Sequence, residues 1–213
     1  MDAAHKISEM IESNPDLFYR VHLIDSMKKV RLRLAKFINA ADVDELVMVP
    51  NATHGVNMIL HNFHWKEDDI LIECKVFSFV LLFVNWPAYC FIVNTTYGAV
   101  SKTVQRYADA VQNLIVQKIT LSFPTQPEAI VSLFRRHIEG LQRKPGATVM
   151  AIIDGIISVP GALIPWEELV KICRDNGVYS LVDGAHLIGQ IPVDVQRADP
   201  DFLVSVRLIS SCW

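Results

Sequence analysis

Residues 178–189 read VYSLVDGAHLIG, and the abrupt step from apolar to polar side chains inside this stretch decides the fold class. The apolar run that ends at Val182 predicts a buried strand, which Asp183 and His186 follow directly. An aspartate at the end of a buried strand is costly unless a cation meets it. A protonated ring nitrogen of a cofactor would be such a cation, and His186 could hydrogen-bond a ring oxygen. A helix-capping aspartate beside an ordinary histidine is the alternative, and these residues alone do not decide between the two.

Strands and helices are predicted to alternate along the chain. Short apolar runs typical of strands occupy residues 46–49, 70–73, 114–121, 149–153 and 178–182. Apolar residues at helical spacing lie between and before them, starting with an amphipathic N-terminal helix that ends at Asn14 and Pro15. Strands joined by helices of this length imply βαβ units. We therefore expect one continuous α/β domain with a mainly parallel central sheet covered by helices.

Three of the predicted helices carry specific expectations. Residues 26–40 are predicted to form a helix with the buried stripe Val30, Leu34, Phe37 and Ile38. Residues 125–128 (TQPE) predict a capping box with proline in the first turn, followed at helical spacing by Ile130, Leu133, Phe134, Ile138 and Leu141. Pro165 is predicted to open the next helix, which ends at Asn176-Gly177 and buries Trp166, Leu169, Val170 and Cys173.

Composition and charge argue against several classes of partner. Apolar residues make up 51% and charged residues 20% of the 213 residues, which is typical of a globular protein. The net charge of −3 gives no electrostatic reason to expect nucleic acid or an anionic membrane as a partner. The four cysteines are scattered without a CxxC pair, so we expect a reduced, cytoplasmic protein without a metal site or a disulfide framework. The first residues contain no apolar core run, so we do not expect a secretory signal.

Two other polar segments follow predicted strands. Residues 50–57 (PNATHGVN) offer a hydroxyl and free N–H groups at the start of a helix, which suits a phosphate, although Thr53 could merely cap that helix. Residues 154–161 (DGIISVPG) follow the predicted strand at residues 149–153, and a plain connecting turn is an equal alternative there. Parallel strands end at one edge of a sheet, so we expect the three segments to meet. A phosphate cradle, a carboxylate for a ring nitrogen and a donor for a ring hydroxyl together describe pyridoxal 5′-phosphate (PLP).

Three motifs carry a resemblance to a known family, namely residues 51–57 (NATHGVN), 96–100 (TYGAV) and above all 180–194 (SLVDGAHLIGQIPVD). They look like those of the class V aminotransferase family of fold-type-I PLP enzymes, in the isopenicillin-N-epimerase-like branch that includes cysteine-conjugate C–S lyases. The resemblance covers nearly the whole chain except residues 75–93 and the last eight residues. It implies a PLP-dependent transferase-like large domain, incomplete at both ends. In the intact family it also implies a homodimer and a small amino-acid-like substrate.

The resemblance implies a role for each cofactor-binding residue. Thr53, with the N–H of His54, would hold the phosphate, and Ser205 would be a further phosphate ligand. Tyr97 would stack on the pyridine ring, as suits an aromatic side chain on an electron-poor ring. The remaining polar contacts, to the ring hydroxyl, the ring nitrogen and the ring oxygen, would come from Ser158, Asp183 and His186. No metal ligand is expected.

The chain departs from the family in two segments. In the family the strand that carries Ser205 continues into a His-Lys pair, whose lysine forms the Schiff base with PLP. Here residues 206–213 read VRLISSCW and no lysine follows Lys171, so we expect a non-family tail, no Schiff-base lysine and an inactive chain as written. Residues 75–93 are expected to be a non-family insertion. Unspliced introns would explain both segments, because codons for residues 74–75 and 206–207 can contain an intron start; a splice isoform or a pseudogene product is the alternative.

Three functions therefore stay open. The first is the core of a PLP-dependent C–S lyase or epimerase that acts on an amino acid. The second is a non-catalytic truncated product or a protein-interaction remnant. The third is a membrane-anchored protein, because residues 76–93 contain no charge and reach the lower length limit for a spanning helix. Asn85 and Pro87 in mid-segment oppose that alternative, so no membrane partner is expected.

Overall fold

The computed structural model describes residues 3–80, 91–94, 98–111 and 114–206. The chain divides into two compact units, each with its own internal contacts. The first unit consists of Met1–Met48 and Asp194–Gln196, and the second consists of Val49–Val193 and Arg197–Trp213. The alternation of strands and helices did not predict this division, and the two units are described separately below.

The first unit is built from short helical elements. They are α1 (Ala3–Ser13), α2 (Pro15–Leu17), the π-helical turn η1 (Phe18–His22), α3 (Leu23–Phe37) and the 3-10 turn η2 (Val43–Glu45). The predicted break after α1 is confirmed, because the side chain of Asn14 caps α2 by accepting a hydrogen bond from the Leu17 N–H at 3.1 Å. Arg31 Nη2 donates to the Val43 carbonyl at 2.6 Å and to Asp44 Oδ1 at 2.8 Å, which joins α3 to η2.

One expectation for this unit holds in part and another is wrong. Of the predicted stripe of the second long helix, Ile38 is buried and Leu34 is half-buried, whereas Val30 and Phe37 are exposed. Residues 46–49 do not form a strand, and Val47 and Met48 are exposed. No described strand pairs with that run, and an apolar run without a pairing partner gains no ladder hydrogen bonds.

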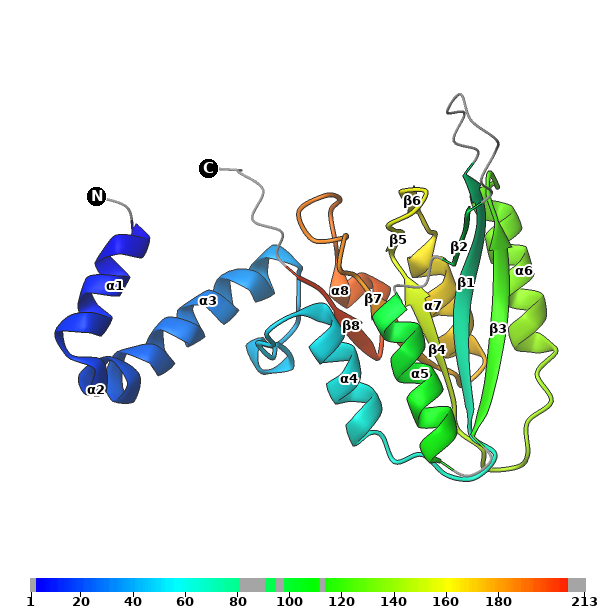
Figure 1. Cartoon of the computed structure of the whole chain (residues 1–213), viewed down its shortest axis with the longest axis horizontal. Helices are drawn as coiled ribbons and strands as arrows, with labels where there is room; N and C mark the ends of the chain where they lie inside the picture. Colours follow the sequence, from blue (N-terminus) through cyan, green and yellow to red (C-terminus); the bar gives the residue numbers. More distant parts are fainter. Residues whose placement is uncertain (1–2, 81–90, 95–97, 112–113, 207–213) are drawn as a thin grey trace. The chain divides into compact units, whose positions relative to one another are not determined.

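The second unit contains a six-stranded, mainly parallel sheet, which confirms the predicted fold class. Its strands are β1 (Ile70–Val80), β2 (Phe91–Asn94), β3 (Ile115–Ser122), β4 (Val149–Asp154), β7 (Tyr179–Asp183) and β8 (Phe202–Val204). β3 and β4 flank β1 on opposite sides, β7 follows β4, and β8 follows β7, all in parallel (Figure 1). β2 alone runs antiparallel, against the last residues of β1.

Helices cover both faces of the sheet (Figure 1). α4 (Ala52–Asn62) and α5 (Gly98–Ala110) pack on one face, and α6 (Pro127–Glu139) and α7 (Trp166–Asp175) pack on the other. A small hairpin of β5 (Ile156–Ile157) and β6 (Ala162–Leu163) follows β4, and the short helix α8 (Val195–Ala198) precedes β8 in the chain. This arrangement buries strand side chains on both faces, as a parallel sheet requires.

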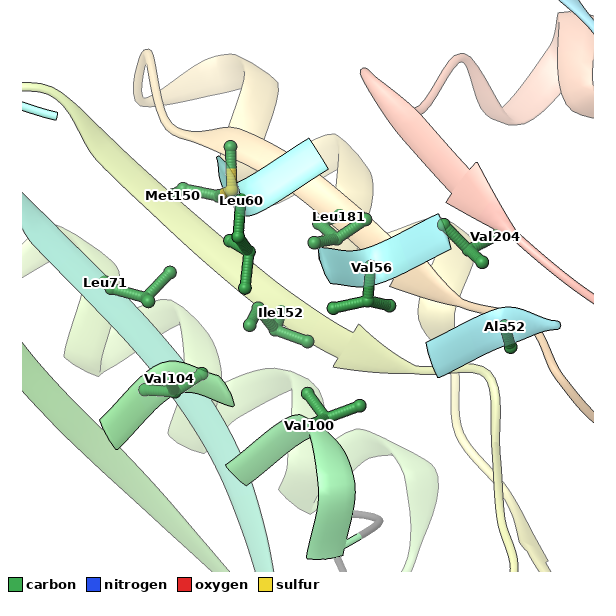
Figure 2. Packing of buried hydrophobic residues seen from close by; sticks show 10 residues of the cluster. All are labelled: Ala52, Val56, Leu60, Leu71, Val100, Val104, Met150, Ile152, Leu181 and Val204. Atoms are coloured by element: carbon green, nitrogen blue, oxygen red, sulfur yellow. The ribbon is translucent and has the colours of Figure 1, made fainter. Parts of the chain in front are cut away.

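The core under α4 and α5 joins the strands that carry the site (Figure 2). Val56 and Leu60 of α4 and Val100 and Val104 of α5 pack against side chains from four strands, which are Leu71, Met150, Ile152, Leu181 and Val204. Fully burying one side chain of this size contributes about 1.5–3 kcal/mol to folding. The same contacts therefore stabilise the unit and fix α4 over the ends of β7 and β8.

The helix ends agree with the sequence in part. The predicted capping box of α6 is absent, because the N-cap is Gln126 and its side chain makes no cap hydrogen bond. This start places Glu128 at the second rather than the third helical position, where it cannot complete the box. The predicted burial of Ile130, Phe134 and Ile138 is confirmed, and so is the predicted buried face of α7.

The expected insertion at residues 75–93 begins inside a strand. β1 continues through it to Val80 and pairs with β3 as far as Phe77, beside Ser122. Residues 81–90 lie outside the described residues, but residues 76–80 and 91–93 are strand where the membrane-anchor alternative requires helix. Within the described part of the chain, no helix is long and apolar enough to cross a membrane.

Candidate functional site

Three acidic residues lie on one face of the sheet near its carboxyl edge. Asp154 of β4 is in register with Asp183 of β7, and Glu73 of β1 is in register with Ile152, two residues before Asp154. Side chains alternate between faces along a strand, so all three share the face of Ile152 and Leu181, which α4 and α5 cover. Glu73 is buried and its Oε1 accepts a hydrogen bond from the Ser101 hydroxyl of α5 at 2.9 Å.

Asp183 is a buried acid that has no Lys or Arg partner among the described residues. Its side chain is only 8% exposed, and its Oδ1 accepts a hydrogen bond from the Ala185 N–H at 3.0 Å. Burial raises the pKa of this carboxyl, while the Ala185 N–H and the nearby His186 act in the opposite direction. The helix-capping alternative is wrong, because residues 185–187 form a turn and not a helix.

The turn after Asp183 is held rigidly. The Gly184 N–H donates to the Val204 carbonyl at 2.7 Å, and the Leu187 N–H donates to the Gly184 carbonyl at 2.9 Å. The Leu187 side chain is fully buried, and a Cβ placed on Gly155 would lie 2.4 Å from its Cδ1. The Gly155 N–H in turn donates to the Asp183 carbonyl at 2.9 Å. These contacts fix the half-buried His186 at the end of β7.

The start of α4 lies beside the end of β8. Asn51 is the N-cap of α4, since its Oδ1 accepts a hydrogen bond from the His54 N–H at 2.8 Å. The alternative that Thr53 caps this helix is therefore wrong, and no hydrogen bond of the half-buried Thr53 hydroxyl is found among the described residues. A Cβ on Gly55 would lie 2.7 Å from Cγ1 of Val204, so the helix backbone packs directly on β8.

The other three predicted cofactor ligands are Ser205, Ser158 and Tyr97. Ser205 is half-buried, and its hydroxyl donates to the Gly184 carbonyl at 2.6 Å. Ser158 lies exposed in the turn between β5 and β6. Tyr97 lies outside the described residues. The structure therefore brings Thr53, Asp183 and Ser205 together around the end of β8. Ser158 lies in the hairpin that directly follows β4, the strand that pairs with β7.

Sequence reasoning gave no role to the other two acids. Asp154 opened one of the three polar segments, but only the register of β4 and β7 reveals that it lies beside Asp183. Burial raises the pKa of Asp154 well above its usual range, and the charges of Asp183 and Glu73 raise it further. Glu73 gave a weaker signal, as a charged residue inside the apolar run of β1.

The described cysteines and histidines do not suggest a second site, either with a reactive thiol or with a metal ion. Cys74 and Cys173 are buried free thiols, and burial together with the nearby Asp201 raises the pKa of Cys173 to about 12. A thiol in such a setting is a poor nucleophile. Within the described ranges there is no group of three or more His, Cys, Asp or Glu that could hold a metal ion.

Comparison with known proteins agrees with this geometry. The family model for "Aminotransferase class-V" matches residues 137–206. The chain is 35% identical over 203 residues to L-cysteine desulfhydrase of Arabidopsis thaliana, covering 90% of this chain and 40% of that protein. It is 31% identical over 194 residues to hercynylcysteine sulfoxide lyase of Schizosaccharomyces pombe, covering 90% of this chain and 42% of that protein.

The solved structures show the same fold at lower identity. A complex between the cystine C–S lyase C-DES and its product cysteine persulfide superimposes with a TM-score of 0.72 at 17% identity, over 95% of this chain and 48% of that one. A cysteine desulfurase from Thermococcus onnurineus gives a TM-score of 0.63 at 22% identity, over 93% of this chain and 45% of that one. The chain thus spans less than half the length of these relatives. Residues 137–206 match part of the class V aminotransferase domain, a family whose cofactor is PLP, and over most of its length the chain is similar to part of these relatives.

Proposed function

We propose that the second unit is the PLP-binding core of an enzyme that cleaves a C–S bond in cysteine or a cysteine-derived amino acid. The observation that carries the proposal is Asp183, a buried carboxylate at the end of β7 without a Lys or Arg partner among the described residues. A protonated pyridine nitrogen would supply the missing cation, and the carboxylate would in turn keep that nitrogen protonated.

The residues around Asp183 fit the other parts of PLP. The Thr53 hydroxyl has no hydrogen-bond partner in the described chain and lies in the first turn of α4, where the helix dipole favours a phosphate. The half-buried His186 is fixed on the turn after β7 and would approach a ring oxygen. Ser158 and Tyr97 would complete the contacts to the ring.

Two existing hydrogen bonds would have to change when a phosphate binds. The His54 N–H is engaged by the Asn51 side chain at 2.8 Å, and the Ser205 hydroxyl is engaged by the Gly184 carbonyl at 2.6 Å. A phosphate oxygen is a stronger acceptor than either of these groups, because it is charged. We therefore propose that both donors turn to the phosphate, while Asn51 and Gly184 keep their places in the backbone.

The chain's own residues would act on the cofactor rather than on the substrate. When bound, PLP supplies an electron sink for the bond that breaks. Asp183 would hold the proton on the ring nitrogen, which maintains that sink, and Thr53 and Ser205 would orient the ring through the phosphate. C–S cleavage is preferred to epimerisation because the relatives reported above are named for reactions at sulfur.

We propose that none of the lysines in these 213 residues attaches PLP. The last lysine of the sequence, Lys171, lies exposed in the middle of α7 and its Nζ pairs with Asp175 Oδ2 at 2.7 Å. We propose that the chain as written holds PLP without a covalent bond and is catalytically inactive. A non-catalytic protein-interaction role is the second candidate, and the many exposed apolar side chains of the first unit favour it.

Three further expectations belong to the same proposal. The intact enzyme would be a homodimer acting on a small amino acid, as the family resemblance implies. The scattered cysteines support a reduced compartment, which we take to be the cytoplasm. Residues 75–93 and 206–213 are proposed to be additions to the family's domain, and sequencing of the mature transcript would test whether they are retained introns.

Titration of the purified chain with PLP tests the function. We expect saturable binding, and we expect Asp183→Asn to weaken it by about tenfold or more, because a hydrogen bond to a charged group is lost. The control is Asp68→Asn, which changes a half-buried aspartate paired with Lys144 just before β1, at the other end of that strand. Equal affinities of Asp183→Asn and the wild type would overturn the role of Asp183.

A second experiment tests whether PLP is covalently bound. Borohydride reduction of the chain with PLP should leave no PLP on a lysine, and a labelled lysine would refute non-covalent binding.

A further inference from the structure

The two aspartates at the ends of β4 and β7 form a carboxyl pair. Asp154 and Asp183 are in direct register, and neighbouring strands lie about 4.8 Å apart, so their side chains meet on the same face. The Gly155 N–H donates to the Asp183 carbonyl at 2.9 Å, which keeps the two strands together to their last residues. Two carboxylates this close in a poorly solvated place cannot both be ionised without a large cost.

The surroundings decide which member of the pair keeps the proton. Asp183 accepts the Ala185 N–H and faces His186, and both features favour its ionised form. Asp154 receives no comparable help, because the charges that act on it are those of Asp183 and Glu73 and both are negative. Its remaining titratable neighbour is Cys74, which lines the same small cavity as Asp154; burial and the nearby Asp154 raise the pKa of this thiol, so it stays neutral and brings no positive charge. The proton therefore belongs on Asp154.

We propose that Asp154 is a positioning residue for Asp183, remaining a neutral carboxylic acid at neutral pH and donating its O–H to the Asp183 carboxylate. This inference rests on the proposed function, in which Asp183 faces the ring nitrogen of PLP. The shared proton fixes the orientation of Asp183 through its two oxygens, one taking the Ala185 N–H and the other taking Asp154. It also limits the pair to a single negative charge, which matches the single positive charge of a pyridinium ring.

The first test uses the chain without PLP. Carbon-13 NMR of the aspartate carboxyl groups should show one resonance whose titration midpoint is the highest of all and lies well above those of exposed aspartates. Asp154→Asn should remove this step, and Glu73→Gln, which neutralises the third acid of the same face, should keep it. The inference fails if every wild-type carboxyl titrates in the ordinary range, or if the high step survives in Asp154→Asn.

The second test measures PLP affinity at neutral pH. Asp154→Asn offers an amide N–H in place of the carboxylic O–H, so we expect an affinity within about twofold of the wild type. Asp154→Leu removes the donor and should weaken PLP binding by about tenfold or more. Equal binding by Asp154→Leu and the wild type would refute the positioning role.

The two tests also separate this inference from the function on which it rests. If the wild-type chain did not bind PLP at all, the proposed function would fail, while the titration of the cofactor-free chain would still decide whether Asp154 carries the shared proton. If PLP bound and the high titration step were absent, the proposed function would stand and the inference about Asp154 would be wrong.

Discussion

At the scale of single residues, the site depends on positions where only a hydrogen fits. Gly155 is the clearest case, because a Cβ there would lie 2.4 to 2.8 Å from three atoms of the buried Leu187 side chain. Leu187 belongs to the turn that carries His186, so any side chain at position 155 must displace this turn from the end of β4. The glycine therefore acts on the site through packing, without touching a ligand.

Gly155→Ala is accordingly expected to destabilise the chain by about 1–3 kcal/mol, the usual cost of overpacking a core. The free energy of unfolding in urea measures this effect. Gly98→Ala is the matched control, because a Cβ at the start of α5 meets nothing within 4 Å. We expect that control to be neutral, and equal stabilities of the two variants would show that the turn after β7 adapts freely.

The pH dependence of stability follows from the carboxyl pair. The pKa values of Asp154 and Asp183 are raised in the folded chain, so above the ordinary aspartate pKa of about 3.9 the folded state binds more protons than the unfolded state. The stability that these groups contribute is thus complete below this pH and is lost as the pH rises through their folded pKa values. Burial lowers the pKa of His137, which acts in the opposite sense as the pH falls below its usual range.

Asp154→Asn should therefore remove part of this loss. We expect the unfolding free energy of the variant, relative to that of the wild type, to increase between about pH 4 and pH 7, since the amide does not ionise. Urea denaturation at several pH values measures the difference, from which the contribution of His137 cancels. A difference that stays constant across this range would contradict a raised pKa at Asp154.

Single residues also mark the limit of sequence reasoning. The position of Asp183 and His186 at a strand end could be predicted, because the apolar run before them predicts the strand that β7 confirms. At the start of α4, both Asn51 and Thr53 are good capping residues, and only the structure shows that Asn51 caps the helix. The role of Asp154 depends on the register between two strands far apart in sequence, and no local pattern contains that information.

At the scale of elements, the first turn of α4 contains one residue expected to affect stability and another expected to affect PLP binding. Asn51 supplies the cap, whereas the Thr53 hydroxyl makes no hydrogen bond in the described chain. Asn51→Ala should cost about 1 kcal/mol of stability through the lost cap. Thr53→Val keeps the shape and removes only the hydroxyl, so it should weaken PLP binding and leave stability nearly unchanged.

Thermal unfolding and PLP titration on both variants measure these two effects separately. Thr53→Val is the control for the stability measurement, and Asn51→Ala is the control for the binding measurement. A Thr53→Val variant that binds PLP as tightly as the wild type would remove Thr53 from the phosphate site.

The elements themselves were largely predictable, and the exceptions have physical reasons. The runs behind β4 and β7 are mostly apolar and are flanked by helices, so their type was clear. The run behind β3 is less uniform, since it contains Gln117 and Lys118, but its apolar residues still favour a strand. The run at 46–49 has the same composition but no pairing partner in the described chain, and pairing is a tertiary property. β1 extends to Val80 because β3 and β2 continue to pair with it, which the charge at Glu73 and Lys75 had concealed.

At the scale of the whole molecule, the two units differ in how they are stabilised. The second unit has a continuous core on both faces of its sheet, and the site lies at the edge of that core. The first unit has large exposed apolar side chains on each of its longer helices, including Ile7, Met10 and Ile24. The sequence could not predict this contrast, because the helices of both units have amphipathic patterns, and such a pattern does not state what will cover its apolar face.

Native-state hydrogen exchange should therefore distinguish two helices of nearly equal length. α1 has 11 residues and none of them is buried, whereas α7 has 10 residues and buries Trp166, Leu169, Val170, Ile172 and Cys173. An isolated helix of this length is marginal in water, so the amides of α1 should exchange by local opening. Those of α7 should exchange only with unfolding of the sheet, more than about 100-fold more slowly. Equal protection of α1 would mean that another surface covers its apolar side chains in solution, and would direct the search for a partner to the first unit.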